Sequence, residues 1–248
     1  MQIVILAGGK GSRISEETVR RPKPMVTIGG VPIIIYVMDI FAKYKFKDFV
    51  ISTGYMGDKI EKFFIKAKKN YYKNKRSLIL SDIKKYNINI VKTGIATNTA
   101  GRILNLKKYL KNEFFFTYAD GVADVNILKL LKSYRKIKKK NKSLISITNP
   151  ISKYGIVETI DKKKIIKRIL EKPKIKTLWI NIGFGVFQKK MLHYIKKPQE
   201  SLEIDVFPRI AKKRELFFYK HKGNFKGMDS LKDKIELEEL YSKGKWCY

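Results

Sequence analysis

The sequence predicts an α/β fold in which a doubly wound, mostly parallel, Rossmann-like sheet carries an inserted antiparallel element. Two observations support this prediction. Up to about residue 150, short apolar runs typical of buried strands alternate with longer segments of helical periodicity, as in parallel sheets covered by helices on both faces. After that point β-like stretches follow one another without helices between them. This indicates an antiparallel insertion at about residues 150–188 of a single domain that spans residues 1–248.

The first part of the chain is expected to hold five strands and four helices. The run Gln2–Ala7 is almost entirely apolar, which is typical of a strand buried on both faces. In Pro32–Tyr44 the residues Ile33, Val37 and Ile40 fall on one stripe, which is typical of a helix packed on a sheet. Further strands are predicted at Lys47–Thr53, Asn87–Lys92, Glu113–Tyr118 and Ser143–Thr148. Further helices are predicted at Gly57–Lys68, Ala100–Leu110 and Val125–Lys140.

The inserted region is expected to hold β-like stretches at Tyr154–Thr159, Ile165–Leu170 and Leu178–Phe187. Short lysine-rich segments with Asp161 or Pro173 separate them, as turns separate antiparallel strands. Beyond the insertion we expect helices at Met191–Lys196, Ile204–Lys213 and Leu231–Ser242, and a strand at Leu216–His221. The segment Lys73–Lys85 is polar and weakly patterned, and it is predicted to be a mobile loop.

The composition fits a globular protein without a membrane span. The chain has 248 residues, of which 44% are hydrophobic, which is enough for a core. No apolar run approaches the roughly 18 residues that a membrane-spanning helix needs, and the N-terminus lacks the layout of a signal peptide. The single cysteine, Cys247, excludes an internal disulfide, so we expect a cytoplasmic location.

The net charge of +33, from 55 basic and 22 acidic residues, raises the question of a nucleic-acid partner. The lysines are scattered along the chain rather than gathered in one block. Runs such as Lys138–Lys140 lie beside apolar segments, where solvated helix faces and turns are expected. No nucleic-acid-binding motif accompanies them. We therefore expect neither nucleic acid nor a membrane as a partner, although the charge predicts non-specific adsorption to nucleic acid at low salt.

The stretch that follows the first predicted strand is suited to binding a triphosphate. Gly8, Gly9 and Gly11 leave backbone amides free of side chains, so that phosphate oxygens can approach closely. Arg13 and Lys23 add positive charges, and the prolines on both sides of Lys23 restrict its backbone. The pattern matches neither a P-loop nor the dinucleotide fingerprint, so a plain strand-to-helix turn is the alternative.

Two aspartates are candidates for holding a metal ion. Asp120 follows the predicted strand Glu113–Tyr118, and Asp229 precedes the predicted last helix. Mg²⁺ prefers one or two carboxylates together with phosphate oxygens and water. The residues alone also allow Asp120 to be a turn residue and Asp229 to be a helix N-cap. Asp124 is expected to cap a helix that begins at Val125.

These segments together resemble a known enzyme family. Leu6–Arg13 followed by Pro22–Met25 resembles the signature of sugar-1-phosphate nucleotidyltransferases. Ser15–Thr18 and Tyr118–Ile127 are similar to the glucose-1-phosphate cytidylyltransferase branch of that family. The resemblance spans nearly the whole chain, and it implies a nucleotide-binding sheet with an inserted sugar-binding element.

The resemblance implies transfer of a cytidylyl group from CTP to glucose 1-phosphate, giving CDP-glucose and pyrophosphate through Mg²⁺-assisted in-line attack at the α-phosphorus. It implies Arg13 and Lys23 as catalytic residues, and Asp120 and Asp229 as the residues that hold Mg²⁺ together. The implied nucleotide-binding residues are Leu6, Ala7, Gly8, Gly9, Gly11, Ser12, Arg13, Thr18, Lys23, Thr93, Gly94, Thr99, Gly101 and Asp120. The implied sugar-phosphate-binding residues are Tyr154, Gly155, Glu171, Lys172, Trp179 and Asn181.

Two departures from the family pattern leave the substrates open. Ile182 stands where the family usually has glycine, and the stretch between Tyr86 and Gly101 is shorter than in the cytidylyltransferase branch. A nucleotidyltransferase that uses another NTP or another phosphorylated acceptor is therefore one alternative. A non-catalytic nucleotide- or nucleic-acid-binding protein is the second. The resemblance also leaves a homo-oligomer open, and it implies nucleotide-sugar supply for polysaccharide biosynthesis.

Overall fold

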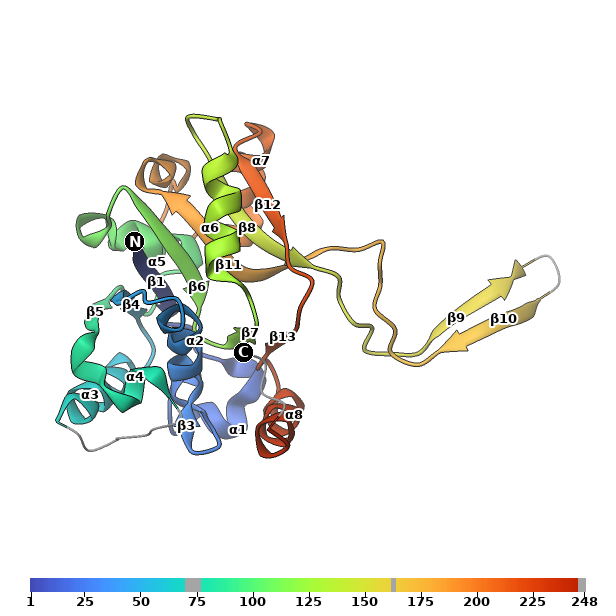
Figure 1. The fold of residues 1–248 in the computed structure, drawn as a ribbon, viewed down its shortest axis with the longest axis horizontal. Coiled ribbons are helices and arrows are strands. Elements are labelled where there is room, and N and C mark those ends of the chain that lie inside the picture. Colours follow the sequence, from blue (N-terminus) through green and yellow to red (C-terminus); the bar gives the residue numbers. More distant parts are fainter. Residues whose placement is uncertain (70–76, 162–163, 245–248) are drawn as a thin grey trace.

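A seven-stranded sheet forms the centre of the molecule (Figure 1). The computed structural model describes residues 1–69, 77–161 and 164–244, so that Cys247 lies outside the described residues. The strand order is β12-β8-β11-β6-β1-β4-β5. The strands are β1 Gln2–Ala7, β4 Asp48–Thr53, β5 Asn87–Lys92, β6 Glu113–Tyr118, β8 Ser143–Thr148, β11 Ile180–Gln188 and β12 Leu216–Lys220. All neighbouring pairs are parallel except those of β11, which runs antiparallel to β6 and β8.

Helices cover both faces of this sheet because its central strands are apolar on both sides. In β1, Ile3 and Ile5 pack into one core cluster, and Val4 and Leu6 pack into another. The first cluster takes in residues of α2 Ile33–Ala42, α3 Gly57–Lys68 and α6 Ile127–Lys136. The second takes in residues of α5 Thr99–Asn105 and α7 Phe207–Lys212. The predicted α/β fold with a mostly parallel sheet is therefore confirmed.

The inserted element is smaller than predicted. Only β9 Ile156–Ile160 and β10 Ile165–Leu170 form the separate antiparallel pair. The third stretch, predicted at Leu178–Phe187, is β11, and it pairs with β6 and β8 inside the main sheet. Its residues Phe184 and Val186 are buried in the core, which explains why this strand joins the body rather than the insertion.

The β9–β10 pair projects from the body as an arm (Figure 1). Every described residue of β10 except Leu170 is exposed, and Ile165, Ile166 and Ile169 are among the exposed apolar side chains. The two connections that lead to the arm come from the ends of β8 and β11. The arm is therefore an appendage of the main sheet and contributes nothing to either core cluster.

Several segments differ locally from the predictions. Of Lys73–Lys85, residues 73–76 lie outside the described residues, but α4 Leu78–Ser81 and a 3-10 turn at Ile83–Lys85 replace the rest of the predicted loop. Ile79 and Leu80 are buried there, and Ser77 caps α4 by accepting a hydrogen bond from the Leu80 amide. The predicted helix at Met191–Lys196 is a 3-10 helix, Lys189–Tyr194. Short elements of this kind depend on tertiary contacts that periodicity does not report.

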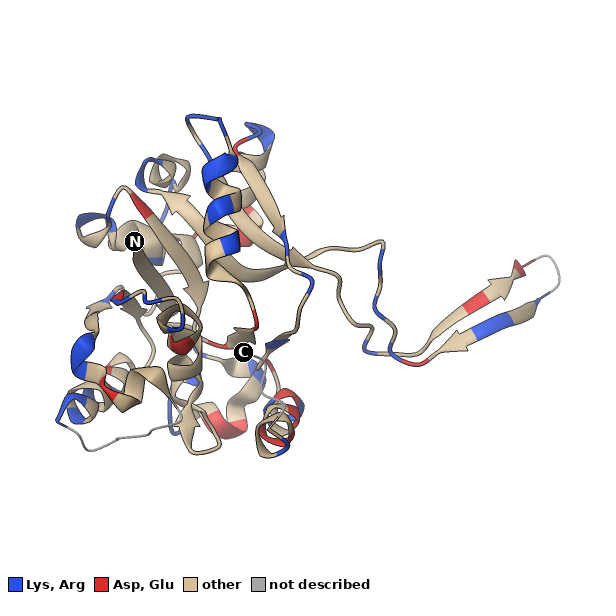
Figure 2. Cartoon of the chain, in the orientation of Figure 1, with Lys and Arg blue, Asp and Glu red and all other residues tan. Residues whose placement is uncertain are grey.

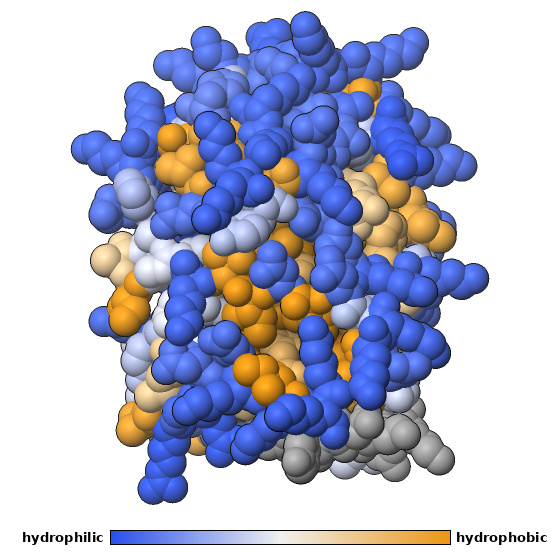
Figure 3. All heavy atoms as spheres, turned by 90° about the vertical axis from the view of Figure 1, so that its left-hand side faces the viewer, coloured by the Kyte–Doolittle hydropathy of each residue, from blue (hydrophilic) through white to orange (hydrophobic). Residues whose placement is uncertain are grey.

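The N-terminal part of the site region holds α1 Ser15–Thr18 and the short hairpin of β2 Thr27–Ile28 and β3 Val31–Pro32. The last helix, α8 Leu231–Ser242, begins where it was predicted to begin. No helix in the described ranges is both long enough and apolar enough to cross a bilayer. Lys and Arg lie along the outward side of α6 and on surrounding loops (Figure 2), and hydrophilic side chains cover much of one face (Figure 3). Lys and Arg are therefore spread over several elements of the fold (Figure 2), as they are along the sequence.

Helix α5 is fixed against the segment that precedes α7. The amides of Asn98 and Ala100 donate to the carbonyl oxygens of Pro198 and Glu200, at 3.0 and 3.1 Å. Gly101 faces the same segment so closely that an added Cβ would lie 1.9 Å from the Pro198 oxygen. Gly101 therefore allows close contact between two backbones.

We expect Gly101→Ala to lower the free energy of unfolding by about 1–3 kcal/mol, because the methyl group would force α5 away from Pro198. Thermal or urea denaturation measures the effect. Gly9→Ala is the matched control, since nothing lies within 4 Å of a Cβ at that position. Identical unfolding curves for Gly101→Ala and the wild-type protein would contradict this expectation.

Candidate active site

The glycine loop begins where β1 ends and turns sharply at Gly11. Gly11 has φ +66°, a left-handed conformation that glycine adopts without strain. Its carbonyl oxygen accepts hydrogen bonds from the Ile14 amide at 3.0 Å and from the Thr18 hydroxyl at 3.1 Å. Thr18 is buried, so it supports the loop from below. The turn leaves Ser12 and Arg13 exposed beside the carboxyl end of β1.

Lys23 lies at the centre of a cluster of charged side chains. Its Nζ is 2.6 Å from Oδ2 of Asp120 and 2.8 Å from Oδ1 of Asp229. Nη2 of Arg13 is 2.9 Å from the same Asp229 oxygen. The side chain of Lys23 is only 10% exposed, whereas that of Arg13 is 76% exposed. Lys23 is therefore a fixed cation, and Arg13 is a cation with room to move.

Two short strands bring the aspartates together. β7 Gly121–Ala123, which directly follows Asp120, pairs antiparallel with β13 Phe225–Gly227, which ends two residues before Asp229. The Met228 amide also donates to the Asp120 carbonyl oxygen at 2.9 Å. Ser230, and not Asp229, is the N-cap of α8, and it forms a capping box with Asp233. The Asp229 carboxylate is therefore free of a capping role and faces Lys23.

Burial and charge act in opposite directions on Lys23. Burial alone would lower the pKa of Lys23, because it disfavours the charged form. The charges and hydrogen bonds of Asp120 and Asp229 more than offset this effect and raise the pKa of Lys23 above its usual value. The ammonium group consequently stays protonated throughout the physiological range and loses its charge only in strongly alkaline solution.

Arg102 fixes the glycine loop from behind. Its guanidinium group is buried and donates to the carbonyl oxygens of Gly8 and Gly94, each at 2.9 Å, and to the Thr93 hydroxyl at 3.1 Å. A Cβ on Gly8 would lie 2.0 Å from Nη1 of Arg102, so only glycine leaves room for it. Burial lowers the pKa of Arg102. Arg102 is not among the predicted nucleotide-binding residues; its one signal is a position in α5 beside Ala100 and Ile103, which are both buried.

A cavity of about 300 Å³ lies over the glycine loop. Most of the predicted nucleotide-binding residues line it, namely Leu6, Ala7, Gly8, Gly9, Gly11, Ser12, Arg13, Lys23, Thr99 and Asp120. Four others do not. Thr18 supports Gly11, Thr93 and Gly94 hold Arg102, and Gly101 packs against Pro198. Their roles in the structure are to shape the site, and direct contact with a nucleotide stays a prediction.

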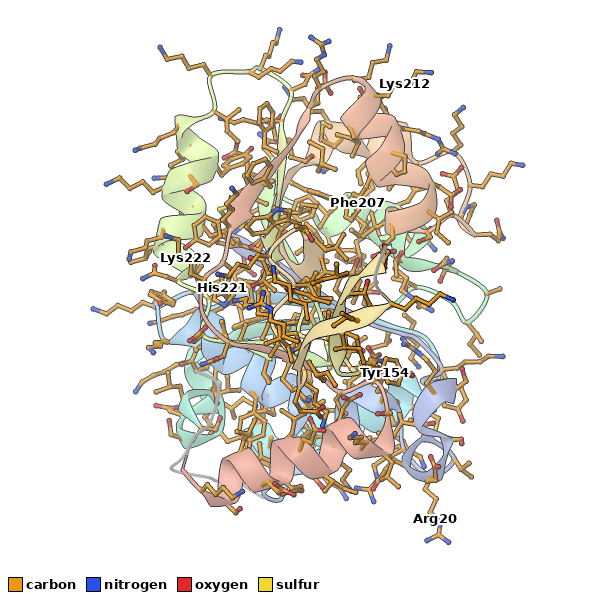
Figure 4. All side chains as sticks on the ribbon, turned by 90° about the vertical axis from the view of Figure 1, so that its right-hand side faces the viewer. Arg20, Tyr154, Phe207, Lys212, His221 and Lys222 are labelled. Carbon is orange, nitrogen blue, oxygen red and sulfur yellow. The ribbon has the colours of Figure 1, made fainter. Side chains whose placement is uncertain are left out.

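A second cavity, of about 220 Å³, adjoins the first and shares Tyr118 and Asp120 with it. Of the six predicted sugar-phosphate residues, only Asn181 lines it. Tyr154, Gly155, Glu171 and Lys172 flank the two arm strands and line neither cavity. All four are exposed, and Tyr154 is labelled in Figure 4, which views the molecule from the side of the arm.

The remaining predicted sugar residues have other surroundings in the structure. Trp179 is exposed, and Nζ of Lys220 lies 4.7 Å from the centre of its ring. Glu171 and Lys172 form an ion pair with each other at 3.2 Å. That these residues bind a sugar phosphate stays a prediction. Their surroundings in the structure give no separate reason for it.

Asp124 differs from its predicted role. Asn126 caps α6 by accepting a hydrogen bond from the Lys129 amide. Asp124 instead accepts a hydrogen bond from the Asn224 amide at 2.7 Å and lies 3.0 Å from Nε2 of His221. These contacts connect the segment after Asp120 to the segment before Asp229, which stabilises the approach of the two aspartates.

Comparisons with known proteins agree with this geometry. The model of the nucleotidyl transferase family matches residues 2–246. Glucose-1-phosphate cytidylyltransferase of Salmonella typhimurium is 34% identical, and the match covers 99% of this chain and 97% of the relative. A Bacillus subtilis protein named as a probable glucose-1-phosphate cytidylyltransferase is also 34% identical, with 98% of this chain and 97% of the relative covered.

Solved structures share the fold. The crystal structure of HddC from Yersinia pseudotuberculosis complexed with GMP-PN superposes with a TM-score of 0.71 at 23% identity, covering 97% of this chain and 99% of that one. At 23% identity, this structural similarity supports a shared fold and nothing more specific. The family match and the two curated relatives show that the chain belongs to the nucleotidyl transferase family and is a nucleotidyltransferase.

Proposed function

We propose that the protein transfers a cytidylyl group from CTP to glucose 1-phosphate and releases pyrophosphate. The observation that carries this proposal is the convergence of the glycine loop, Arg13, Lys23 and Asp120 at one cavity. Asp229 lines the adjoining cavity and pairs with both Lys23 and Arg13. The names of the Salmonella and Bacillus relatives support cytidine as the base and glucose 1-phosphate as the acceptor.

In the proposed reaction, a phosphate oxygen of glucose 1-phosphate attacks the α-phosphorus of CTP. The bond between that phosphorus and the bridging oxygen to the β-phosphorus breaks, and pyrophosphate leaves with the electron pair. The attacking oxygen is already anionic, so no general base and no covalent enzyme intermediate is needed. Catalysis then consists of positioning and charge neutralisation. Lys23 is suited to the α-phosphate because it is fixed, and Arg13 is suited to the β- and γ-phosphates because it can move toward them.

The donor set at the cluster fits Mg²⁺. Oxygens of Asp120 and Asp229 lie 2.6 and 2.8 Å from Nζ of Lys23, so both carboxylates can contact a single cation. Two carboxylates completed by phosphate oxygens and water are the donor set that Mg²⁺ prefers. We therefore propose that Asp120 and Asp229 hold Mg²⁺ when substrates are bound. The ion would neutralise part of the charge on the phosphates.

Another acceptor or another NTP is the second candidate. Ile182 lines the second cavity and is buried, so it reduces the space that a glycine would leave there. The cavity also contains Glu203, whose negative charge suits some acceptors better than others. The transfer chemistry is the same in this candidate, and only the identity of the substrates changes.

A substrate panel tests the proposal and separates the candidates. Each of CTP, UTP, GTP and ATP is combined with glucose 1-phosphate and other sugar 1-phosphates, and pyrophosphate release is measured in the presence of Mg²⁺. We expect the highest kcat/KM with CTP and glucose 1-phosphate. If kcat/KM is highest with another NTP and sugar 1-phosphate, that pair replaces CTP and glucose 1-phosphate as the proposed substrates. Absence of pyrophosphate with every pair would contradict nucleotidyl transfer and favour a non-catalytic nucleotide- or nucleic-acid-binding protein.

We expect Lys23→Ala to lower kcat by roughly 100- to 1000-fold, the usual effect of removing one preorganised positive or hydrogen-bonding group from a transition state. Steady-state pyrophosphate release measures the change. Lys10→Ala is the matched control, since Lys10 belongs to the neighbouring glycine loop but is exposed and forms no ion pair with any described residue. Turnover of Lys23→Ala near the wild-type rate would refute the assignment of Lys23.

A further inference from the structure

The two adjoining cavities differ in the sign of the charge that lines them. Arg13, Lys23 and Arg102 line the first cavity. Within the described part of the chain, the second cavity is lined by the carboxylates of Asp120, Asp229 and Glu203 and by no Lys or Arg. The first cavity is therefore suited to phosphates, and the second is suited to a neutral group that can donate hydrogen bonds.

Glu203 differs from the two aspartates in having no cation beside it. Asp120 and Asp229 both pair with Lys23, whereas no described Lys or Arg forms an ion pair with Glu203. Among the described residues, the side-chain partners of the Glu203 carboxylate are three hydroxyl groups. The Ser201 hydroxyl donates to Oε2 at 2.7 Å, the Thr99 hydroxyl lies 3.2 Å from the same oxygen, and the Tyr118 hydroxyl donates to Oε1.

Counting acceptor sites shows that Glu203 has capacity left. Each carboxylate oxygen offers about two lone-pair sites. The hydroxyls of Thr99 and Ser201 fill those of Oε2, and the Tyr118 hydroxyl fills one of the two on Oε1. Burial raises the pKa of Tyr118, and the Glu203 charge adds to that effect, so Tyr118 stays a donor. One acceptor site of Oε1 therefore remains for a ligand in the cavity.

The backbone around Glu203 holds the carboxylate in place. Glu203 lies in a single π-helical turn, Leu202–Val206, and turns of this kind are frequent at functional sites. The Ser201 hydroxyl accepts from the amides of Glu203 and Ile204, and the Leu202 amide donates to the Thr99 hydroxyl at 2.8 Å. Thr99 also lines the first cavity, so one residue links the nucleotide side to Glu203.

Asn181 supplies the complementary hydrogen-bonding group in the same cavity. Its Oδ1 accepts from the Gly183 amide at 3.0 Å, which fixes the orientation of the side chain. Among the described residues, its Nδ2 has no hydrogen-bond partner, so two N–H donors remain. A donor and an anionic acceptor in one small cavity are suited to sugar hydroxyls, which both donate and accept.

We propose that Glu203 is a specificity-determining residue that accepts a hydrogen bond from a hydroxyl group of the acceptor sugar. The inference rests on the proposed function and names a residue that selects its acceptor. The negative charge of Glu203 also repels phosphate. It therefore favours the orientation in which the sugar phosphate lies beside Lys23 and the sugar ring lies in the second cavity.

The test compares Glu203→Gln with the wild-type enzyme on glucose 1-phosphate and on its 2-, 3-, 4- and 6-deoxy analogues. We expect the variant to raise KM for glucose 1-phosphate by roughly 10- to 100-fold, the range for a lost hydrogen bond to a charged group, while KM for the NTP stays within about two-fold. In the wild-type enzyme one deoxy analogue should lose a similar factor in kcat/KM. In Glu203→Gln, kcat/KM for the same analogue should be nearly equal to kcat/KM for glucose 1-phosphate, because the hydrogen bond is already absent.

Asp205→Asn is the matched control, because Asp205 holds the same turn through the Ser201 amide at 2.8 Å but lines neither cavity. It should leave the acceptor KM unchanged. Glu203→Asp keeps the negative charge but places the carboxylate farther from the cavity, because the side chain is one methylene shorter. It should give an intermediate KM for the acceptor. Equal deoxy-analogue penalties in the wild-type enzyme and Glu203→Gln, or a change confined to KM for the NTP, would overturn the inference while leaving the proposed function intact. No pyrophosphate from the wild-type enzyme with any pair would overturn both.

Discussion

The ion pairs of Lys23 with Asp120 and Asp229 are the interaction on which the rest of the site depends. Two carboxylates at this separation repel each other, and a buried ammonium group between them compensates the repulsion. In the proposed reaction Lys23 neutralises phosphate charge directly, and Asp120 and Asp229 contribute through the Mg²⁺ that they would hold. Because Lys23 already holds Asp120 and Asp229 together, the proposed transfer requires little reorganisation of these side chains.

Contacts between segments that are far apart in the sequence position this cluster. β7 and β13 join segments from the middle and the end of the chain, and the contact of Asp124 with His221 closes the same junction. Arg102 fixes the glycine loop from the opposite side, through its hydrogen bond to the Gly8 carbonyl oxygen. The result is one positively lined cavity for phosphates beside one lined by carboxylates, with Asp120 at the boundary between them.

Local patterns were sufficient to predict the parallel core, because apolar alternation and helical periodicity are properties of short segments. The glycine loop and its two cations were predictable for the same reason. The place of β11 was not, since a strand of the insertion and a strand of the main sheet have the same pattern, and only the long-range pairing with β6 and β8 distinguishes them. Arg102 and Glu203 were not predicted, because their roles depend on contacts between segments far apart in the sequence. The position of Glu171 and Lys172 beside the arm strands was not predictable either, because it depends on where β10 lies in the fold.

The central claim is that Asp120 and Asp229 act as one unit. The most direct test is a double-variant cycle, in which kcat/KM is measured for Asp120→Asn, for Asp229→Asn and for the double variant. If both carboxylates hold one ion, either single change disables the unit, and the double variant should be little worse than the more damaging single variant. Losses that multiply in the double variant would show independent roles and contradict the account.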